Sequence, residues 1–101
     1  MVLIYHFDWN ADKARGNRQK HGISFQQAST VFHDQLAVTI FDADHSDDEE
    51  RWVTIGQASG GQTLVVIHTF TALNQSEAKV RLISARRADR QETKDYEETP
   101  H

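Results

Sequence analysis

Hydrophobic and polar residues alternate at the start of the chain and again through its second half. In residues 2–9 the apolar side chains Leu3, Tyr5, Phe7 and Trp9 fall on one side, which predicts a strand. The same period of two returns in LAVTIF, RWVTIGQA, TLVVIHTF and AKVRLISA, which predict four more strands. The Gly-rich link SGGQ predicts a hairpin turn. The run LVVI is apolar on both sides, so it predicts a central strand.

Two helices are predicted between the first strand and the other four. Asn10 is a good N-cap for a helix over residues 11–21, and Gly22 is a good stop for it. Ser24 with Gln27 three residues later has the pattern of a capping box, which predicts a second helix through TVF. The side chains that the second helix would turn toward a core are Phe25, Ala28 and Phe32.

A third helix is predicted after the last strand. Asp89 is placed to cap it, and Glu92 is placed to reach back to the cap. Tyr96 is its only sizeable apolar group, so this helix should pack loosely. The order of elements predicts a single α+β domain over residues 1–101, with helices on one face of a sheet. We expect an antiparallel sheet of about four to five strands, two N-terminal helices packed on it, and a C-terminal helix.

Length and composition narrow the class of protein. A chain of 101 residues has room for one core. It contains no cysteine, so disulfides, thiolate metal sites and a cysteine nucleophile are excluded. The start lacks the basic lead and the length of a signal peptide, and no run of residues approaches a membrane span. We expect a cytoplasmic protein with no membrane partner.

The position of the charges tells more than the net charge of -4. The first basic cluster is Lys13, Arg15, Arg18 and Lys20; the second basic cluster is Lys79, Arg81, Arg86, Arg87, Arg90 and Lys94. The acids gather in an acidic loop, DADHSDDEE, at residues 42–50. Charge runs are often only solvated surface, but a basic face binds polyanions whatever the net charge is. We expect the two basic clusters to lie side by side as a groove for RNA phosphates, with the acidic loop elsewhere.

The sequence does not predict a metal site. A calcium loop of the EF-hand type that began at Asp42 would need Gly at its sixth position and Glu at its twelfth. Those positions hold Asp47 and Val53. The histidines are scattered and none has the paired spacing of HExxH. We therefore expect no metal and no cofactor.

The remaining chemistry is basic. Cleavage of RNA without a metal needs a base for the 2′-hydroxyl, cations for the phosphorane and an acid for the leaving 5′-oxygen. Lys20 and His21 lie before a helix stop, and Arg81 and Arg86 lie around the end of the last strand. Histidine titrates near neutral pH and so could exchange protons. Taken alone, His21 is more typical of a helix-end residue that bonds a carbonyl, so residue types leave a nuclease as one interpretation among several.

Three blocks of sequence resemble a known family. FDWNADKARGNRQKHGISFQQA, DADHSDDEERWVTIGQASGGQTLVV and VRLISARRA resemble, in the same order, the BrnT family of toxins from bacterial type II toxin–antitoxin systems. The resemblance covers roughly residues 7–96. It implies a RelE-like ribonuclease fold and an endoribonuclease whose RNA cleavage inhibits growth. It also implies a cognate DNA-binding antitoxin that neutralises the toxin and joins it in a complex on operator DNA.

The resemblance also assigns roles to residues. It implies that Lys20 and His21 transfer protons or contact phosphate, and that Arg81 and Arg86 stabilise the charge of the transition state. Glu50 would be a base, or else the partner of an arginine such as Arg51 or Arg81. The residues expected to bind or position the RNA are Lys13, Asn17, Arg51, Arg87 and Arg90.

One departure keeps a second hypothesis open. Where family members often carry Arg after the glycine of the S-x-x turn, this chain has Gln62. The chain could then be a catalytically degenerate interaction module that binds the antitoxin and regulates the operon. A third hypothesis, an unrelated RNA-binding domain, would need exposed aromatic platforms beside the basic clusters.

Overall fold

The computed structural model describes residues 3–98. In chain order its elements are β1 (Ile4–Asp8), α1 (Ala11–His21), α2 (Phe25–Ser29), the 3-10 helix η1 (Thr30–His33), β2 (Val38–Phe41), the 3-10 helix η2 (Ala43–His45), β3 (Trp52–Gln57), β4 (Thr63–His68), β5 (Thr71–Ala72), β6 (Glu77–Arg87) and α3 (Arg90–Glu98). The predicted α+β class and the order of elements are confirmed. No helix in these described residues is long and apolar enough to cross a membrane.

The strands form one mixed sheet in the order β1-β6-β4-β3-β2, and β5 pairs with β6. β4 lies between β3 and β6, as the run LVVI predicted. The SGGQ link is the turn between antiparallel β3 and β4, with Gly61 at a φ of 91° that favours glycine. β1 pairs with β6 in parallel, so the prediction of a purely antiparallel sheet was wrong. A period of two identifies a strand but carries no information about the direction of its partner.

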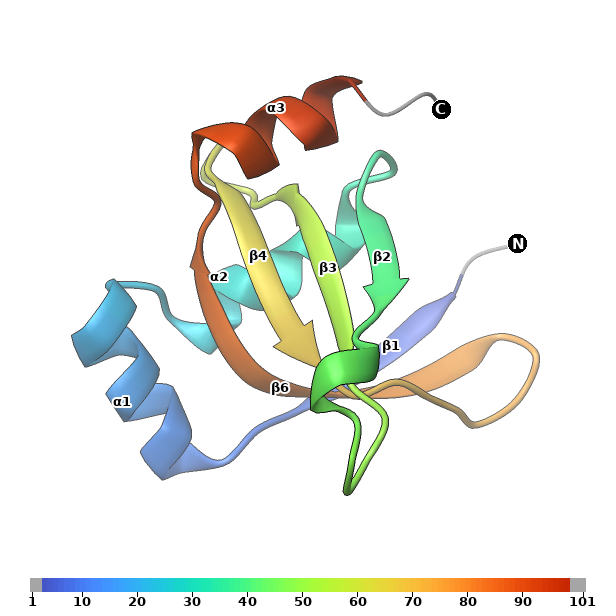
Figure 1. The fold of residues 1–101 in the computed structure, drawn as a ribbon. Coiled ribbons are helices and arrows are strands. Elements are labelled where there is room, and N and C mark those ends of the chain that lie inside the picture. The colour runs from blue at the N-terminus through green and yellow to red at the C-terminus, as the bar shows by residue number, and fades with distance from the viewer. Residues whose placement is uncertain (1–2, 99–101) are drawn as a thin grey trace.

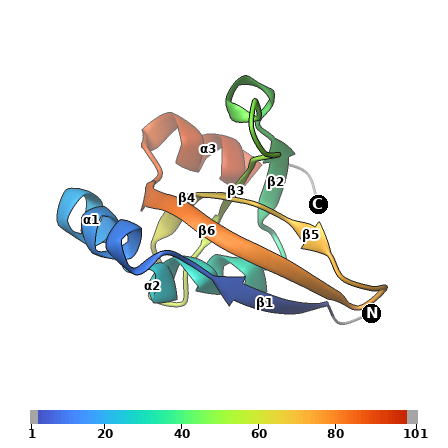
Figure 2. The ribbon, with the colours of Figure 1, turned by 90° about the horizontal axis from the view of Figure 1, so that it is seen from below.

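The helices lie on both sides of the sheet (Figure 1). α2 with η1 covers one face, α3 crosses the opposite face, and α1 stands beside the edge of β6 (Figure 2). The prediction that helices cover one face was therefore wrong for α3. The core lies between the sheet and α2 with η1, and its buried members are Ile23, Phe25, Ala28, Val31, Ala58, Leu64, Val66, Val80, Leu82 and Ala85.

The predicted caps are present. The side chain of Asn10 accepts hydrogen bonds from the backbone N–H groups of Asp12 and Lys13, at 2.9 and 3.1 Å. Gly22 ends α1 in the left-handed conformation, at a φ of 72°. The hydroxyl of Ser24 accepts from the N–H of Gln27 at 3.0 Å. These contacts fix the first two helix starts and explain why local sequence located them.

α2 is shorter than predicted and its capping box is incomplete. The α-helix ends at Ser29 and the chain continues as the 3-10 helix η1. The amide of Gln27 bonds Gln62 in the β3–β4 turn and does not return to Ser24. The side-chain amide of Gln27, which a complete capping box would use, therefore makes a tertiary contact instead.

α1 is held by one buried side chain, not by an apolar stripe. β1 pairs with β6 only as far as Arg81, where the chain turns away into α1. Beyond that point Asn17, which is 7% exposed, donates to the carbonyl of Ala85 at 2.9 Å. Its side-chain oxygen accepts from the Ala85 N–H at 3.0 Å, and its amide also donates to the carbonyl of Ile23. Asn17 thus takes the place of a neighbouring strand.

Candidate active site

A β-bulge in β6 brings its two key arginines to one face of the sheet. Ile67 pairs with Ser84 and His68 pairs with Leu82, so Ile83 is an extra residue. Before the bulge Leu82 points into the core, and after it Ala85 does. The alternation has changed phase by one residue. Arg81 and Arg86, five positions apart, consequently share the face opposite the core, whereas a regular strand would separate them.

Arg81 stands between two shallow pockets on that face, and together we call them the Arg81 pocket. One, of about 310 Å³, is lined by Asp8, Glu49, Glu50, Thr69, Phe70, Thr71, Lys79 and Arg81. The other, of about 260 Å³, is lined by Asn10, Lys13, Arg81, Leu82 and Ile83. Arg81 therefore has carboxylates and the ammonium group of Lys79 on one side, and the ammonium group of Lys13 on the other. A base, three cations and open surface therefore meet here.

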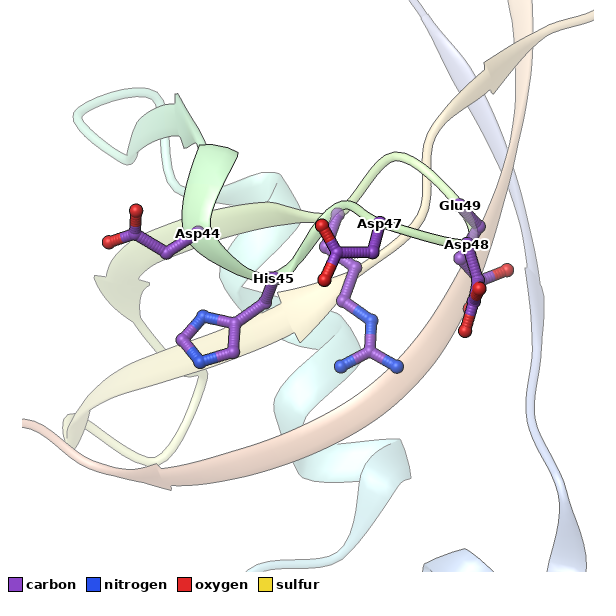
Figure 3. Close-up of a pocket in the computed structure, with 6 residues that line it drawn as sticks. Asp44, His45, Asp47, Asp48 and Glu49 are labelled. Atoms are coloured by element: carbon purple, nitrogen blue, oxygen red, sulfur yellow. The ribbon is translucent and has the colours of Figure 1, made fainter.

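The acidic loop contributes to this site, which contradicts the prediction that it lies elsewhere. Glu49 accepts a hydrogen bond from the guanidinium of Arg81 and forms an ion pair with it. The register explains the contact, because Trp52 pairs with His68 and His68 with Leu82. The residues just before β3 are therefore level with Arg81. Figure 3 shows Asp48 and Glu49 at the opposite end of the loop from Asp44.

Glu50 and Arg51 occupy different surroundings. Glu50 is exposed and lines the Arg81 pocket. An ion pair of Glu50 with Arg81 was one predicted alternative, but Glu49 forms that ion pair instead. Arg51 lines a separate pocket of about 210 Å³ with Asp44, His45, Asp47, Asp48 and Glu49. Its Nε is buried and finds no acceptor within residues 3–98. The guanidinium of Arg51 thus belongs to the acidic loop, and RNA binding by Arg51 gains no support.

The acids of this loop are not gathered around one point. In the part of the chain that the structure describes, no three His, Asp or Glu side chains are grouped so that they could hold a metal ion. His45 bonds Asp42 at 3.0 Å, and Ser46 ties the loop to Asp42 and to Arg51. The loop is built from these local contacts.

Arg86 is held by the last helix. Its two terminal nitrogens donate to the two carboxylate oxygens of Glu92 at 2.7 and 2.8 Å. This contact, above all others, lowers the pKa of Glu92 to about 2, and the same contact raises the pKa of Arg86. Glu92 also completes the predicted capping box, because it accepts from Asp89 N–H at 3.0 Å and donates its own N–H to Asp89 at 2.8 Å. One carboxylate therefore both caps α3 and neutralises Arg86.

Lys20 and His21 lie away from the Arg81 pocket. α1 runs alongside β6 in the same direction, with Lys13 beside Leu82 and Asn17 bonded to Ala85. A helical rise of ~1.5 Å per residue carries the end of α1 about 5 Å beyond Asn17. That distance matches one to two residues of strand, which places Lys20 and His21 level with Arg86. Lys20 is exposed and His21 is half-buried.

The first basic cluster is divided by α1. Lys13 faces β6, whereas Arg15 and Arg18 line a pocket of about 140 Å³ with Ser24, Phe25 and Gln26. Arg15 also forms an ion pair with Asp12. The expected groove between the two basic clusters therefore includes only part of the first one.

The second basic cluster is divided by the alternation of β6. Arg87 pairs with Leu64 of the core, so it lies on the other face from Arg86, and it is exposed. Arg90 is exposed at the first position of α3. Of the residues expected to bind RNA, only Lys13 lines the Arg81 pocket; Asn17 is a buried structural residue whose amide is already hydrogen bonded.

Three acids near the arginines were not among the predicted site residues. Asp8 pairs in register with Arg81, Glu49 bonds Arg81, and Glu92 bonds Arg86. The capping box revealed the helical role of Glu92, but no local signal connects it with Arg86. Asp8 and Glu49 meet Arg81 only through strand pairing, which periodicity does not reveal.

Comparison with known proteins identifies the family. A family model described as the ribonuclease toxin, BrnT, of type II toxin–antitoxin systems matches residues 9–92. The chain belongs to the BrnT family. The crystal structure of the Brucella abortus ribonuclease toxin BrnT is similar over 89% of this chain and 99% of that one. The TM-score is 0.56 and the sequence identity 26%. No curated protein sequence matches the chain.

Membership in the BrnT family makes this chain a ribonuclease toxin with RNA as substrate and an antitoxin as partner. The hypothesis of a degenerate interaction module is not supported. Gln62, on which that hypothesis rested, bonds Gln27 of α2. It is therefore directed to the core side of the sheet, away from the face that carries Arg81 and Arg86.

Proposed function

We propose that this BrnT-family toxin cleaves RNA at the Arg81 pocket without a metal ion. The observation that carries the proposal is the position of Arg81 between Lys13 on one side and Glu49 and Glu50 on the other. A carboxylate base, a guanidinium and an ammonium group are the three kinds of group that the reaction needs.

Glu50 is the proposed base because it is exposed in the pocket and Glu49 already pairs with Arg81. Glu50 removes the proton of the 2′-hydroxyl, and the 2′-oxygen attacks the adjacent phosphorus. The bond from phosphorus to the 5′-oxygen breaks, and Lys13 gives that oxygen a proton. The products are a 2′,3′-cyclic phosphate and a 5′-hydroxyl. Arg81 stabilises the charge that grows on the phosphoryl oxygens.

Arg86, Lys20 and His21 are proposed to bind phosphates beside the scissile one. Arg86 lies five positions after Arg81 along the strand, a distance of at most ~17 Å. That spacing favours contact with a different phosphate. The ion pair with Glu92 must then open, or be shared, when RNA binds Arg86. Binding should weaken steeply as salt rises, because each phosphate contact releases counterions.

The antitoxin is proposed to be a DNA-binding protein that forms a complex with the toxin on operator DNA, and the toxin is proposed to act in the cytoplasm. Both proposals follow from the family resemblance. An acidic or groove-blocking antitoxin segment that covers Arg81 would neutralise the toxin by excluding RNA.

Cleavage of RNA by the purified chain tests the proposed chemistry. The assay contains EDTA, and the ends of the products are mapped. Cleavage that survives EDTA and leaves 2′,3′-cyclic phosphate and 5′-hydroxyl ends is the expected result. Loss of cleavage in EDTA that added Mg²⁺ restores, or products with 5′-phosphate ends, would refute this mechanism.

A further inference from the structure

An apolar pocket lies on the core side of the sheet, at the end that η1 leaves uncovered. It measures about 410 Å³ and is lined by Leu3, Tyr5, Phe32, Thr39, Trp52, His68 and Phe70. The lining includes residues of both edge strands, since Tyr5 belongs to β1 and Thr39 to β2. The two edges of the sheet therefore meet at one pocket. The proposed cleavage mechanism does not use this pocket.

The polar groups of Thr39, Thr54 and His68 form a chain of hydrogen bonds in which each group donates to the next. His68 Nδ1 lies 2.9 Å from the carbonyl of Thr69, so it carries the proton. Nε2 then accepts from the hydroxyl of Thr54 at 2.7 Å, and Thr54 in turn accepts from Thr39 at 2.7 Å. Thr39 is left with only acceptor capacity toward the pocket. Trp52 instead offers an unused donor, because its Nε1–H is buried and has no acceptor within the described residues.

The apolar surface continues outside the pocket. Phe41 is 45% exposed and packs edge-on against Trp52, with ring centroids 5.1 Å apart. Phe70, at the rim, is 39% exposed. Large apolar side chains that are exposed together are typical of a protein interface. Phe70 also lines the Arg81 pocket, so this surface reaches the border of the proposed cleavage site.

The backbone of β2 offers an edge for a further strand. Asp42 N–H bonds the Arg51 carbonyl at 2.8 Å, so Asp42 and Arg51 form a hydrogen-bonded position at the end of the β2–β3 ladder. In an antiparallel ladder, hydrogen-bonded pairs alternate with pairs that are not hydrogen bonded. The N–H and C=O groups of Thr39 and Phe41 therefore point away from β3. Within residues 3–98 no strand pairs with that outer edge. An extended peptide can add there and gain main-chain hydrogen bonds.

Charge at the end of β2 indicates the sequence of such a peptide. The acidic loop follows Phe41 directly and holds six acids, with Arg51 as the neighbouring arginine. Asp44, Asp47 and Asp48 are exposed. A segment that runs along β2 toward this loop meets negative charge, so a lysine or arginine at that end is favoured.

We propose that an extended segment of the antitoxin adds to the outer edge of β2, places a large apolar side chain in the pocket beside Trp52, and sets a basic residue against the acidic loop. The proposal rests on membership in a toxin–antitoxin family and deepens the partner assignment. A segment anchored there lies next to Phe70, from which it can extend over the Arg81 pocket and exclude RNA.

Two matched variants test the side-chain anchor. Phe41→Lys places a charge on the proposed surface, and Ile40→Lys places the same charge one residue away on the opposite face, where Ile40 is 55% exposed. Binding of each purified toxin to the antitoxin encoded beside it is measured by calorimetry. Phe41→Lys should weaken binding by about tenfold or more, while Ile40→Lys should change it by less than about twofold. Equal effects, or a larger effect of Ile40→Lys, would overturn the proposal.

RNA cleavage by the same variants separates this proposal from the proposed catalytic mechanism. Phe41 has no part in the Arg81 pocket, so Phe41→Lys should cut RNA at the wild-type rate, which also shows that it folds. If wild-type toxin fails to cut RNA, the mechanism is lost but the binding result stands. A Phe41→Lys protein that neither cuts nor folds is replaced by Phe41→Ser in the same comparison.

Hydrogen exchange tests the added strand. The amides of Thr39 and Phe41 should exchange about tenfold or more slowly when antitoxin is bound, whereas the amide of Ile40 is already bonded to β3 and should change little. Unchanged exchange at Thr39 and Phe41 would overturn strand addition. A toxin homodimer that Phe41→Lys dissociates would assign this edge to a second copy of the chain instead.

Discussion

The side chain of Asn17 satisfies both backbone groups of Ala85, with hydrogen bonds of 2.9 and 3.0 Å. It thereby continues the β-ladder where β1 leaves β6, and it fixes α1 beside the arginines of β6. In a helix with little apolar surface, Asn17 is the buried side chain.

Replacement of Asn17 by alanine should therefore lower the free energy of unfolding by about 3 kcal/mol, because buried N–H and C=O groups lose their partners. Gln19→Ala, an exposed change on the same helix, should cost less than ~0.5 kcal/mol. Urea denaturation of both variants measures the difference. Equal stability of the two would show that Asn17 does not hold α1.

The pair of Arg86 and Glu92 should make α3 sensitive to acid. The pKa of Glu92 is lowered to about 2, so its contribution to stability is present above its ordinary pKa, near 4.5, and is lost as pH falls toward 2. Glu92→Gln should melt earlier than wild type at pH 7, and the gap should close between pH 4.5 and 2. Because Glu92 is partly exposed, the effect should be small. A gap that does not depend on pH would contradict the account.

Removal of Glu92 should also release Arg86 for RNA. Glu92→Gln takes away a negative charge and one of the two carboxylate oxygens that accept from the Arg86 guanidinium. RNA should bind this variant more tightly than it binds the wild type.

Arg86→Ala should lower the rate of RNA cleavage by about tenfold or more, which is the effect of one charge-assisted contact. Arg86→Ala should cost under about 1 kcal/mol of stability. Full cleavage and toxicity by Arg86→Ala at matched expression would refute its role.

His68 should destabilise the fold in weak acid. Burial lowers the pKa of His68, and its two ring nitrogens are both hydrogen bonded in the neutral form. As pH falls below about 6.5 the unfolded chain binds a proton that the folded chain refuses, so stability decreases. Thermal unfolding from pH 7.5 to 5 should show this decrease, and His68→Gln should flatten it. Identical pH profiles for the two proteins would be inconsistent with a buried neutral His68.

Local signals in the sequence located the elements of the fold well. Asn10, Gly22 and Ser24 mark helix ends through contacts with residues a few positions away. The period of two found the long strands, and the apolar run found the central one. The direction of strand pairing could not be predicted in the same way. β1 runs parallel to β6, and no local feature of the sequence encodes that direction. The RelE-like description of the fold stays a prediction.

The candidate site was harder to predict because it depends on register. Arg81 and Arg86 were named from the sequence, but the bulge at Ile83 that puts them on one face leaves no local mark. The acidic loop was expected far from the arginines, yet strand pairing brings Glu49 to Arg81. Asn17 looked like an RNA ligand on the polar side of α1, while its burial against β6 is visible only in three dimensions.

The rate of RNA cleavage by Arg81→Ala, compared with Arg15→Ala, tests the central claim most directly. Each change removes one arginine; Arg15 is exposed and Arg81 is half-buried. Arg81 borders the two pockets that hold Lys13 and Glu50, whereas Arg15 lies on the other side of α1. Measured under single-turnover conditions in EDTA, Arg81→Ala should lose about a hundredfold or more in rate, as removal of a transition-state cation requires, while Arg15→Ala stays within about threefold of wild type. Equal rates for the two variants, both close to wild type, would contradict the assignment of this pocket as the cleavage site.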